Sequence, residues 1–264
     1  SIANDVAVTS DGGYVAVGAE GNEGGAVDFL LFKQDDLGDP VWDKTVSYTP
    51  YDEALALAET LDGGLMIAGQ SQDEAVVGRL LKTTVDGEPV WERTYEADAL
   101  RAFTGVVALP DGSYALSAVG YRDAESLDDD LCLVRVSATG DVLWKRAFGG
   151  AGDDVAYGLA VAPDGGFVLV GSIYQFGSSK GNTAGDDIYV VKTDREGNED
   201  WKRAYDGPGS DRARAVVPAG DDGYVVAATR DLGGGDTDIY VFKTDALGRI
   251  EWEHWRGGAG TDEA

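Results

Sequence analysis

A tryptophan returns five times along this chain, each time four residues after a glycine. The tryptophans are Trp42, Trp91, Trp144, Trp201 and Trp252, and the glycines are Gly38, Gly87, Gly140, Gly197 and Gly248. A period of about fifty residues is typical of repeat proteins, in which one small unit cannot bury its apolar face alone and packs on its neighbours. The sequence therefore predicts one array of five similar units.

Each unit predicts four short strands separated by turns. The first strand carries alternating small residues, as in 54–58, 156–160 and 213–217. An Asp-Gly turn follows, such as Asp62-Gly63-Gly64, where glycine supplies the positive φ of a tight hairpin. The third strand is a nearly continuous apolar run, as in 187–192, so we expect it to be covered on both faces. The fourth strand carries the tryptophan, which we expect to pack between sheets.

Four strands in about fifty residues predict an all-β fold, a β-propeller of five blades with four antiparallel strands each. No apolar stripe of helical period lasts three turns. The repeats cover 1–51, 52–100, 101–153, 154–210 and 211–261, in a single domain that spans 1–264. Residues 262–264 either begin a further repeat or close the ring, and we favour closure.

The net charge of −27 is the second strong feature of the composition. It disfavours nucleic acid and anionic membrane surfaces as partners, because the chain would repel a polyanion. Two explanations of the acidity remain open. It is typical of proteins from salt-loving microbes, where high ionic strength screens self-repulsion. Alternatively, aspartates gather into calcium sites, since calcium takes carboxylate and carbonyl oxygens.

Single residues exclude several kinds of site. Cys132 is the only cysteine, so it forms no intramolecular disulfide, and its apolar neighbours predict burial. His254 is the only histidine and lies on the predicted outer strand, which disfavours a histidine-based triad or zinc site. No apolar run is long enough to span a bilayer, so we expect no membrane insertion within this chain.

The segment 192–197 followed by Trp201, with 243–252 as its twin, resembles two propeller signatures. These are the tryptophan-docking repeat of quinoprotein propellers and the Asp-box turn of sialidases. A closer overall match is to uncharacterised bacterial and archaeal surface proteins with repeats of the type D-x-Y-x-x-K-x-D-x-x-G. That resemblance implies an extracellular propeller without an assigned catalytic role. One cysteine cannot form the vicinal disulfide of the quinoproteins, and the sialidase arginine triad is not evident.

Loop lengths indicate where a site would lie. The number of residues from the turn aspartate to the lysine or arginine that ends the third strand varies from unit to unit. All of this variation falls in the connection between the second and third strands. In a four-stranded blade this connection lies on the same face as the linker between blades, and variable loops often form binding surfaces. We call this face the loop face and expect the ligand there.

The candidate ligand residues on the loop face are Asp52, Arg101, Asp154, Asp211 and Tyr174. The candidate calcium ligands are Asp128, Asp130, Asp187, Asp236 and Asp238. The alternative for the aspartates that begin each first strand is structural: each accepts hydrogen bonds from the glycine-rich linker before it, such as 149–152.

These observations predict a non-catalytic binding or scaffolding propeller, extracellular or at the cell surface, monomeric, with a protein or glycan ligand on the loop face. One alternative is a carbohydrate-active hydrolase that uses acidic residues of this face, since glycoside hydrolysis needs a pair of carboxyl groups. A second alternative is a structural spacer within a longer surface protein.

Overall fold

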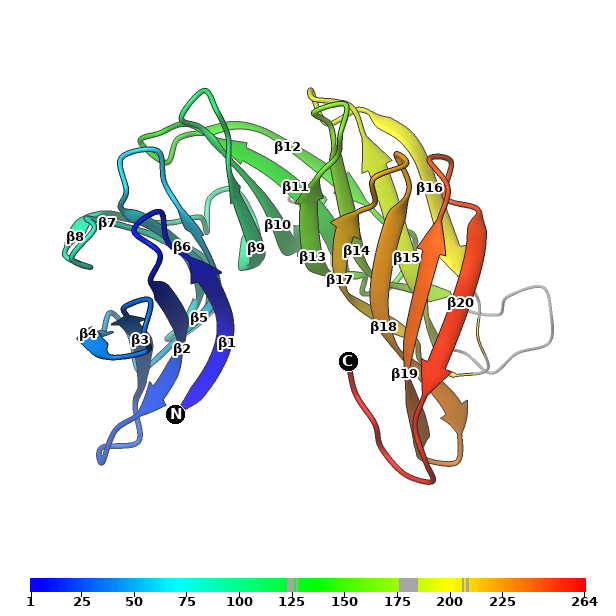
Figure 1. Ribbon diagram of the computed structural model, residues 1–264, viewed down its shortest axis with the longest axis horizontal. Helices are drawn as coiled ribbons and strands as arrows, with labels where there is room; N and C mark the ends of the chain where they lie inside the picture. The colour runs from blue at the N-terminus through cyan, green and yellow to red at the C-terminus, as the bar shows by residue number, and fades with distance from the viewer. Residues whose placement is uncertain (123–125, 127, 176–184, 206, 208) are drawn as a thin grey trace. The chain divides into compact units, whose positions relative to one another are not determined.

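The computed structural model describes residues 1–122, 126, 128–175, 185–205, 207 and 209–264 (Figure 1). The described residues contain twenty strands and no helix. They therefore contain no helix with the length and apolarity needed to cross a bilayer. Every four consecutive strands form an antiparallel meander, which we call a blade, numbered first to fifth in chain order.

The blades follow the repeats of the sequence closely. The first comprises β1 (Ile2–Val8), β2 (Tyr14–Gly21), β3 (Val27–Gln34) and β4 (Pro40–Val46). The second comprises β5 (Tyr51–Glu59), β6 (Leu65–Gln72), β7 (Val76–Thr83) and β8 (Pro89–Thr94). The third comprises β9 (Leu100–Ala108), β10 (Tyr114–Tyr121), β11 (Asp129–Val136) and β12 (Val142–Phe148). The fourth comprises β13 (Val155–Val161), β14 (Phe167–Gln175), β15 (Gly185–Thr193) and β16 (Glu199–Tyr205). The fifth comprises β17 (Arg212–Pro218), β18 (Tyr224–Gly233), β19 (Asp236–Thr244) and β20 (Ile250–Arg256).

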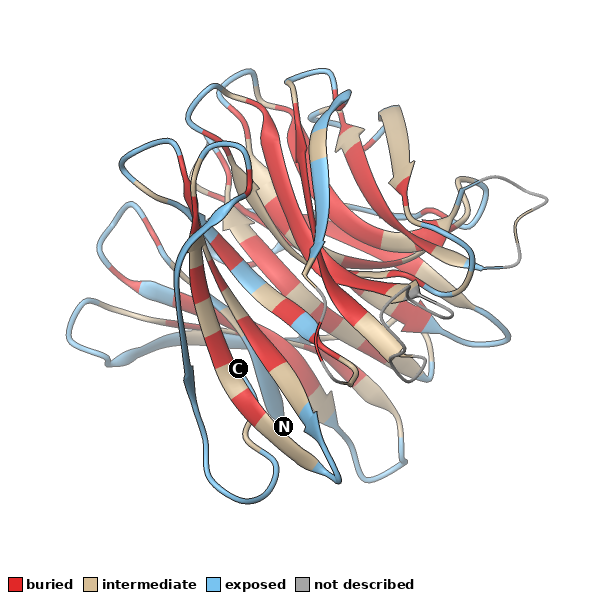
Figure 2. Ribbon diagram, turned by 90° about the vertical axis from the view of Figure 1, so that its right-hand side faces the viewer, coloured by how far each residue is buried: buried red, intermediate tan, exposed pale blue. Residues whose placement is uncertain are grey.

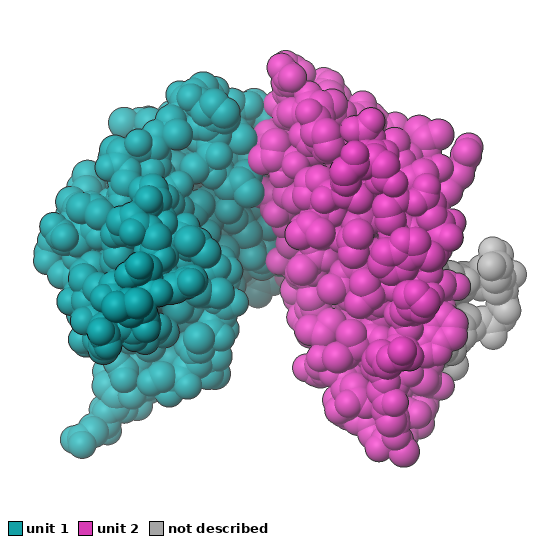
Figure 3. All heavy atoms as spheres, viewed as in Figure 1, with its two compact units in different colours: residues 1–120, 134–144 teal, residues 121–133, 145–264 magenta. Residues whose placement is uncertain are grey.

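The chain divides into two compact units (Figure 3). The first contains 1–120 and 134–144, and the second contains 121–133 and 145–264. In the first unit, Val27 of β3 pairs in parallel with Tyr51 of β5, which joins the first two blades into one eight-stranded sheet. The single domain and the closed ring expected from the sequence stay predictions.

Each unit has a core between the faces of successive blades. In the first unit it includes Val17, Phe29, Leu57 and Ile67, and in the second it includes Val170, Val190, Val226, Tyr240 and Phe242. Figure 2 shows that buried residues follow the strands and that the turns are exposed. The core is therefore built from residues of one blade that face its neighbour, as the apolar patterning of the strands predicts.

The small residues of the second strand of a blade have a steric cause. The first strand of the second blade shifts register between Ala54 and Ala56, which brings its main chain against Gly69 of β6. A Cβ on Gly69 would lie 2.0 Å from the carbonyl oxygen of Glu53. Only glycine fits this close approach without moving the strand.

Burial of the third strands differs from the expectation. Residues 78–83 of β7 and 187–193 of β15 are buried without interruption, as predicted. In β3 and β19, however, buried and half-buried residues largely alternate. The third strands of the first and fifth blades are therefore less completely buried than those of the second and fourth.

Candidate functional site

The A–B hairpins, which join the first and second strands of each blade, share one ion-paired cradle. In the fourth blade, Lys192 of β15 donates hydrogen bonds to Asp164 (2.6 Å), Asp200 (2.9 Å) and the carbonyl of Thr193 (2.8 Å). These bonds use all three hydrogens of the ammonium group. Burial pushes the pKa of Asp164 up, but the hydrogen bonds from Lys192 and Gly166 outweigh it and hold that pKa below its ordinary value.

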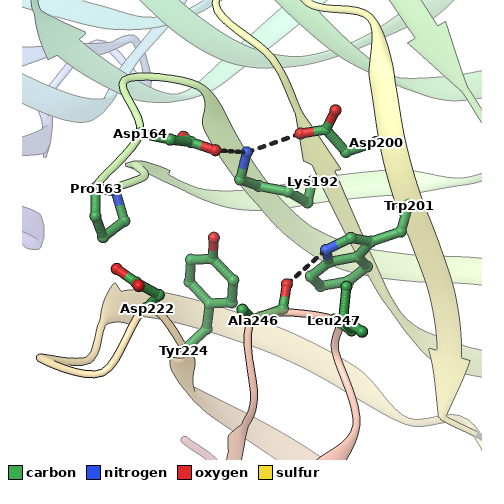
Figure 4. A pocket seen from close by; sticks show the side chains of 9 residues that line it. All are labelled: Pro163, Asp164, Lys192, Asp200, Trp201, Asp222, Tyr224, Ala246 and Leu247. Carbon is green, nitrogen blue, oxygen red and sulfur yellow. Dashed lines mark hydrogen bonds and ion pairs between the residues drawn. The ribbon is translucent and has the colours of Figure 1, made fainter.

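The cradle borders a pocket of about 510 Å³ in the second compact unit, between turns of the fourth and fifth blades (Figure 4). Tyr224 lines this pocket but is only 2% exposed, so its ring face is not available for stacking. Trp201 donates its indole hydrogen to the carbonyl of Ala246 at 2.9 Å. The polar groups at the floor of this pocket are thus engaged with one another.

The same cradle recurs in the other blades. Its pairs are Lys33–Asp11 (2.5 Å), Lys82–Asp62 (3.0 Å), Arg135–Asp111 (2.6 Å) and Lys243–Asp221 (2.6 Å). Each turn aspartate also accepts the main-chain N–H two residues later, as Asp164 does from Gly166 at 2.9 Å. A feature present in all five blades holds the hairpins together and does not by itself indicate a ligand site.

The loop face presents the aspartates that the sequence singles out. Asp52, Asp154 and Asp211 lie at the start of β5, β13 and β17, and all three are fully buried. Asp154 accepts the main-chain N–H groups of Gly150 and Tyr174, both at 2.7 Å. These bonds tie the linker before the fourth blade to the end of β14.

Asp52 shows the same arrangement in the first compact unit. It accepts the main-chain N–H groups of Tyr48 at 2.7 Å and Thr49 at 2.8 Å, and the Thr49 hydroxyl at 2.9 Å. Hydrogen bonds from the preceding linker are what the structural alternative expects of this position. Arg101 takes the equivalent place at the start of β9, where it is half-buried.

A second aspartate lies close to Asp154, on the third strand of the preceding blade. Asp130 of β11 lies twenty-four positions before Asp154. A Cβ on Gly149 would meet Asp154 Oδ2 at 2.2 Å and Asp130 Oδ1 at 2.3 Å. The two carboxyl groups therefore meet across the main chain of one glycine, where a side chain cannot fit.

The spacing of twenty-four recurs and was available in the sequence, but the pairing was not part of our prediction. It separates Asp28 from Asp52, Asp187 from Asp211, and Asp238 from Asp262. In the fifth blade, a Cβ on Gly257 would likewise meet Asp238 Oδ1 at 1.8 Å and Asp262 Oδ2 at 2.9 Å. The second blade has Val77 and Arg101 at these two positions instead.

The carboxyl pairs of the second compact unit are electrostatically unequal. Arg122 donates to Asp130 at 2.8 and 3.3 Å, while burial raises the pKa of Asp154 despite its main-chain hydrogen bonds. Burial, with a smaller contribution from the charge of Asp187, raises the pKa of Asp211 to about 6. Asp154 and Asp211 therefore retain their protons at a higher pH than an ordinary carboxyl group.

Asp211 is the most unusual of these groups. Its Oδ1 accepts the N–H of Asp231 at 2.8 Å, but its buried Oδ2 has no hydrogen-bond partner among the residues that the structure describes. The nearest cation, Arg230, has its Nε 4.0 Å from this oxygen and its guanidinium over the ring of Tyr240. A buried carboxyl oxygen without a partner is expensive when charged, which explains the direction of the pKa shift.

The candidate calcium ligands are used in other ways. Asp128 and Asp236 each accept a linker N–H, from Gly152 at 3.4 Å and from Gly260 at 3.0 Å. Asp130 is held by Arg122, and Asp187 and Asp238 are buried in the carboxyl pairs. Within the described ranges, no three acidic, histidine or cysteine side chains gather as a metal site. Calcium needs six to eight oxygen ligands, so the calcium expectation gains no support there.

Two residues behave as their sequence context predicts. Cys132 is fully buried, and burial raises the pKa of its thiol to about 12, which makes it unreactive. His254 is exposed on β20. Tyr174, the remaining candidate, is half-buried and lies against the linker, because a Cβ on Gly152 would come within 2.4 Å of its ring.

Comparison with known proteins shows the type of fold. No family model matches the chain, and no curated protein matches it. Among solved structures, an α-L-arabinanase of Penicillium chrysogenum complexed with arabinobiose superposes with a TM-score of 0.59 at 14% identity, over 94% of this chain and 80% of that one. An ulvan lyase of polysaccharide lyase family PL25 has a TM-score of 0.57 at 10% identity, over 94% and 68%. These similarities support a β-propeller-type, all-β fold.

A third similar structure is an apocarotenoid oxygenase of Synechocystis, with a TM-score of 0.52 at 13% identity, of which this chain spans 61%. The arabinanase and the ulvan lyase overturn our leading functional expectation. A non-catalytic binding or scaffolding module is contradicted, because these neighbours act on carbohydrates and favour the alternative of a carbohydrate-active hydrolase.

Proposed function

We propose that this chain is a carbohydrate-active hydrolase whose acidic groups are the carboxyl pairs on the loop face of the second compact unit. Glycoside hydrolysis needs one carboxyl group that is protonated near neutral pH and a second that is charged. The observation that carries the proposal is the pKa of Asp211, which burial raises to about 6. Asp187, whose charge contributes to that rise, is the partner that we propose for the second role.

The pair Asp130–Asp154 repeats this division of roles. Arg122 donates hydrogen bonds to Asp130, while burial raises the pKa of Asp154. Asp154 and Asp211 are both fully buried. The main chain of Gly149 lies against Asp154, and that of Gly207 lies against Asp211. A glycan can reach either acid only where this main chain shifts, and a glycine adds no side chain to that movement.

The charge of the chain narrows the substrate class. A net charge of −27 repels polyanionic glycans, so an uncharged polysaccharide is the better substrate. Similarity of fold to an arabinanase agrees with a neutral pentose or hexose polymer. We further propose that the protein works outside the cell in concentrated salt, where such polymers occur and where counterions screen its acidic surface.

The test is release of reducing ends from a panel of neutral polysaccharides, measured in concentrated KCl across acidic to neutral pH. The variants are Asp211→Asn, Asp154→Asn and the double variant, with glycan binding measured by calorimetry. Loss of an acid catalyst lowers turnover by roughly 10²-fold or more without abolishing binding. Asp52→Asn is the matched control, because it changes the same repeat position but a carboxyl group whose oxygens are hydrogen-bonded.

If the wild-type protein releases no reducing ends from any polymer, or if the double variant turns over as fast as the wild type, the hydrolase proposal fails. Parallel loss of binding and turnover in Asp52→Asn would show that these positions act only through folding.

A further inference from the structure

The pocket between the turns of the fourth and fifth blades has features that the shared cradle does not explain. It lies in the second compact unit, at the opposite end of the strands from the loop face, so it is separate from the carboxyl pairs (Figure 4). Its volume of about 510 Å³ is in the range of pockets that hold small molecules, which is about 300–1,000 Å³.

One wall of the pocket is a contact that joins successive blades. The tryptophan of the outer strand lies on the turn glycine of the next blade, and a Cβ on Gly248 would be 2.7 Å from the ring of Trp201. In the first compact unit the same contact, at 3.1 and 2.9 Å, joins the pairs Trp42–Gly87 and Trp91–Gly140. This wall is therefore part of the repeat and is not specific to the pocket.

The first compact unit has the equivalent pocket between the second and third blades. Its residues Asp62 and Tyr114 take the places of Asp164 and Tyr224. Its volume is only about 170 Å³. The two pockets can therefore be compared position by position.

Two acidic side chains distinguish the larger pocket from the smaller one. Asp222 takes the place of Gly112. The residue before the outer-strand tryptophan is Asp200 in the fourth blade and Val90 in the second. The larger pocket is thus lined by three acidic side chains and the smaller pocket by one.

Asp222 has a backbone conformation that favours glycine. Its φ is +64°, and the four other A–B hairpins have glycine at this position. A non-glycine residue is strained in this left-handed region, although aspartate tolerates it better than most. The adjacent Asp221 binds Lys243 at 2.6 Å, whereas Asp222 forms no hydrogen bond or ion pair with the residues that the structure describes. The hairpin therefore does not need the carboxyl group of Asp222.

Tyr224 presents a second polar group without a partner. The residue is 2% exposed, and its hydroxyl group points into the pocket (Figure 4). No hydrogen bond joins this hydroxyl group to another of the described residues. Burial raises the pKa of Tyr224, Lys192 opposes that rise, and three neighbouring acids add to it: Asp164, Asp222 and Asp200. A buried hydroxyl group without a partner costs free energy, which a ligand that binds it would recover.

The side chains that line this pocket can accept hydrogen bonds but have few to donate. Lys192 uses all three of its hydrogens within the cradle, and Trp201 donates its indole hydrogen to the carbonyl of Ala246. Among the lining side chains, only Tyr224 keeps a free donor. A sugar hydroxyl group both donates and accepts, whereas an ammonium or guanidinium group only donates. The lining therefore favours a cation over a neutral sugar, and the acidic side chains add electrostatic attraction.

We propose that this pocket binds an organic cation, namely a primary ammonium or guanidinium group on a short carbon stem. The head group lies among Asp164, Asp200 and Asp222 and donates a hydrogen bond to the hydroxyl group of Tyr224. The stem lies on Leu247, which lines the pocket and is 51% exposed. Long cationic side chains commonly place their carbon stems on apolar surface in this way. Binding here does not depend on hydrolysis at the loop face.

The test is calorimetric titration of the whole chain with n-butylammonium chloride, in KCl sufficient to keep the chain folded. Two temperatures are used, because a binding enthalpy can be zero at one of them. n-Butanol has the same carbon stem without the charge, and arabinobiose is the neutral sugar. We expect n-butylammonium to bind at a single site and the two neutral probes not to bind.

Two substitutions remove the proposed contacts. Asp222→Asn removes the acid and keeps a residue that tolerates the left-handed conformation, and Tyr224→Phe removes only the hydroxyl group. Each lowers the association constant roughly fivefold or more, because each removes a hydrogen bond to a charged group. Asp222→Gly binds as weakly as Asp222→Asn. It unfolds at a similar urea concentration to the wild type, since relief of strain offsets the greater freedom of glycine in the unfolded chain.

Two matched controls leave binding unchanged. Tyr114→Phe removes the same hydroxyl group from the smaller pocket, which lacks the two added acids. Asp36→Asn removes one exposed acid that lines neither pocket. Equal weakening in Asp36→Asn and Asp222→Asn overturns the proposal, because the attraction would then arise from net charge alone.

A further probe, Nα-acetyl-lysinamide, distinguishes two sources of the cation. Binding as tight as that of n-butylammonium supports a lysine side chain of a peptide, and much weaker binding supports a free amine. If the wild-type chain shows no binding of n-butylammonium at either temperature, the proposal is overturned. Equal binding of n-butanol or arabinobiose overturns it as well. Each of these results is independent of whether the chain hydrolyses a polysaccharide.

Discussion

The turn glycines of the first compact unit offer a graded test of how much the tryptophan contact contributes to stability. Gly38, Gly87 and Gly140 occupy the same turn position, with φ between +73° and +86°. An alanine at any of them is strained in this left-handed region by roughly 1–2 kcal/mol. The three positions differ in what the added methyl group meets.

At Gly38 a Cβ meets nothing within 4 Å, so Gly38→Ala reports the backbone strain alone. At Gly140 it would lie 2.9 Å from both the ring of Trp91 and the Cδ of Arg93. Overpacking of this kind costs about 1–3 kcal/mol in addition. At Gly87 the nearest atoms lie at 3.1 Å, so Gly87→Ala falls between the other two. The expected order of destabilisation is Gly38→Ala, then Gly87→Ala, then Gly140→Ala.

The measurement is urea unfolding at constant high KCl and low protein concentration, followed by tryptophan fluorescence. Urea leaves the ionic strength unchanged, so screening of the acidic surface is equal in all variants. If Gly38→Ala and Gly140→Ala lower the free energy of unfolding equally, the contact between Trp91 and Gly140 carries no measurable energy. The argument for blade-to-blade docking through tryptophan would then be refuted.

Three further predictions follow from charges and ion pairs. The pKa of Asp211 is about 6 in the folded chain, against 3.8 for an ordinary aspartate, so its contribution to the free energy of unfolding is complete below pH 3.8 and is lost as pH rises through 6, by roughly 3 kcal/mol. Urea unfolding between these pH values measures the loss. In Asp211→Asn this pH dependence is absent. Asp62 shows the opposite pH dependence, because hydrogen bonds from Thr60 and Lys82 lower its pKa to about 2. Its contribution to the free energy of unfolding is therefore lost as pH falls from 3.8 toward 2. In Asp62→Asn, stability no longer falls for this reason in that acidic range. Dialysis into low salt unfolds the chain, because its net charge of −27 is no longer screened. We expect circular dichroism to show that KCl without calcium keeps the chain folded. Rescue of the fold by calcium but not by KCl would favour calcium sites instead.

Much of the fold follows from residues that repeat in register. The Asp-Gly hairpins, the small residues opposite them and the spaced tryptophans predict twenty strands in five meanders, and the described chain has them. This worked because each signal is local: a positive-φ turn, an alternation of small and large residues, or a ring of fixed spacing. The coverage of each blade is not local. The apolar pattern of 28–33 resembles that of 187–192, yet several residues of β3 are only half-buried, whereas 187–193 of β15 are buried without interruption.

The candidate site was located in part. The sequence pointed to Asp154 and Asp211, but it could not show that burial raises their pKa values, because burial depends on the linkers packed over them. The pairing itself was accessible, since the spacing of twenty-four recurs in four places. The pairing is hidden when residues are compared within one repeat, because each pair joins the third strand of one blade to the start of the next.

The contacts across the blade boundary explain why one sequence period serves both folding and the proposed chemistry. Between the fourth and fifth blades, the pair Asp187–Asp211 on the loop face and the contact of Trp201 with Gly248 both join one blade to its successor, so that junction is held at two points. At the junction before the third blade, Val77 and Arg101 replace the carboxyl pair, yet Trp91 still lies on Gly140. Packing of β9 on β5, β6 and β7 and the contact of Trp91 with Gly140 join these two blades, so a buried carboxyl pair is not required at this junction. Groups that cost desolvation energy and are dispensable for the junction are the ones for which a chemical role has to be sought.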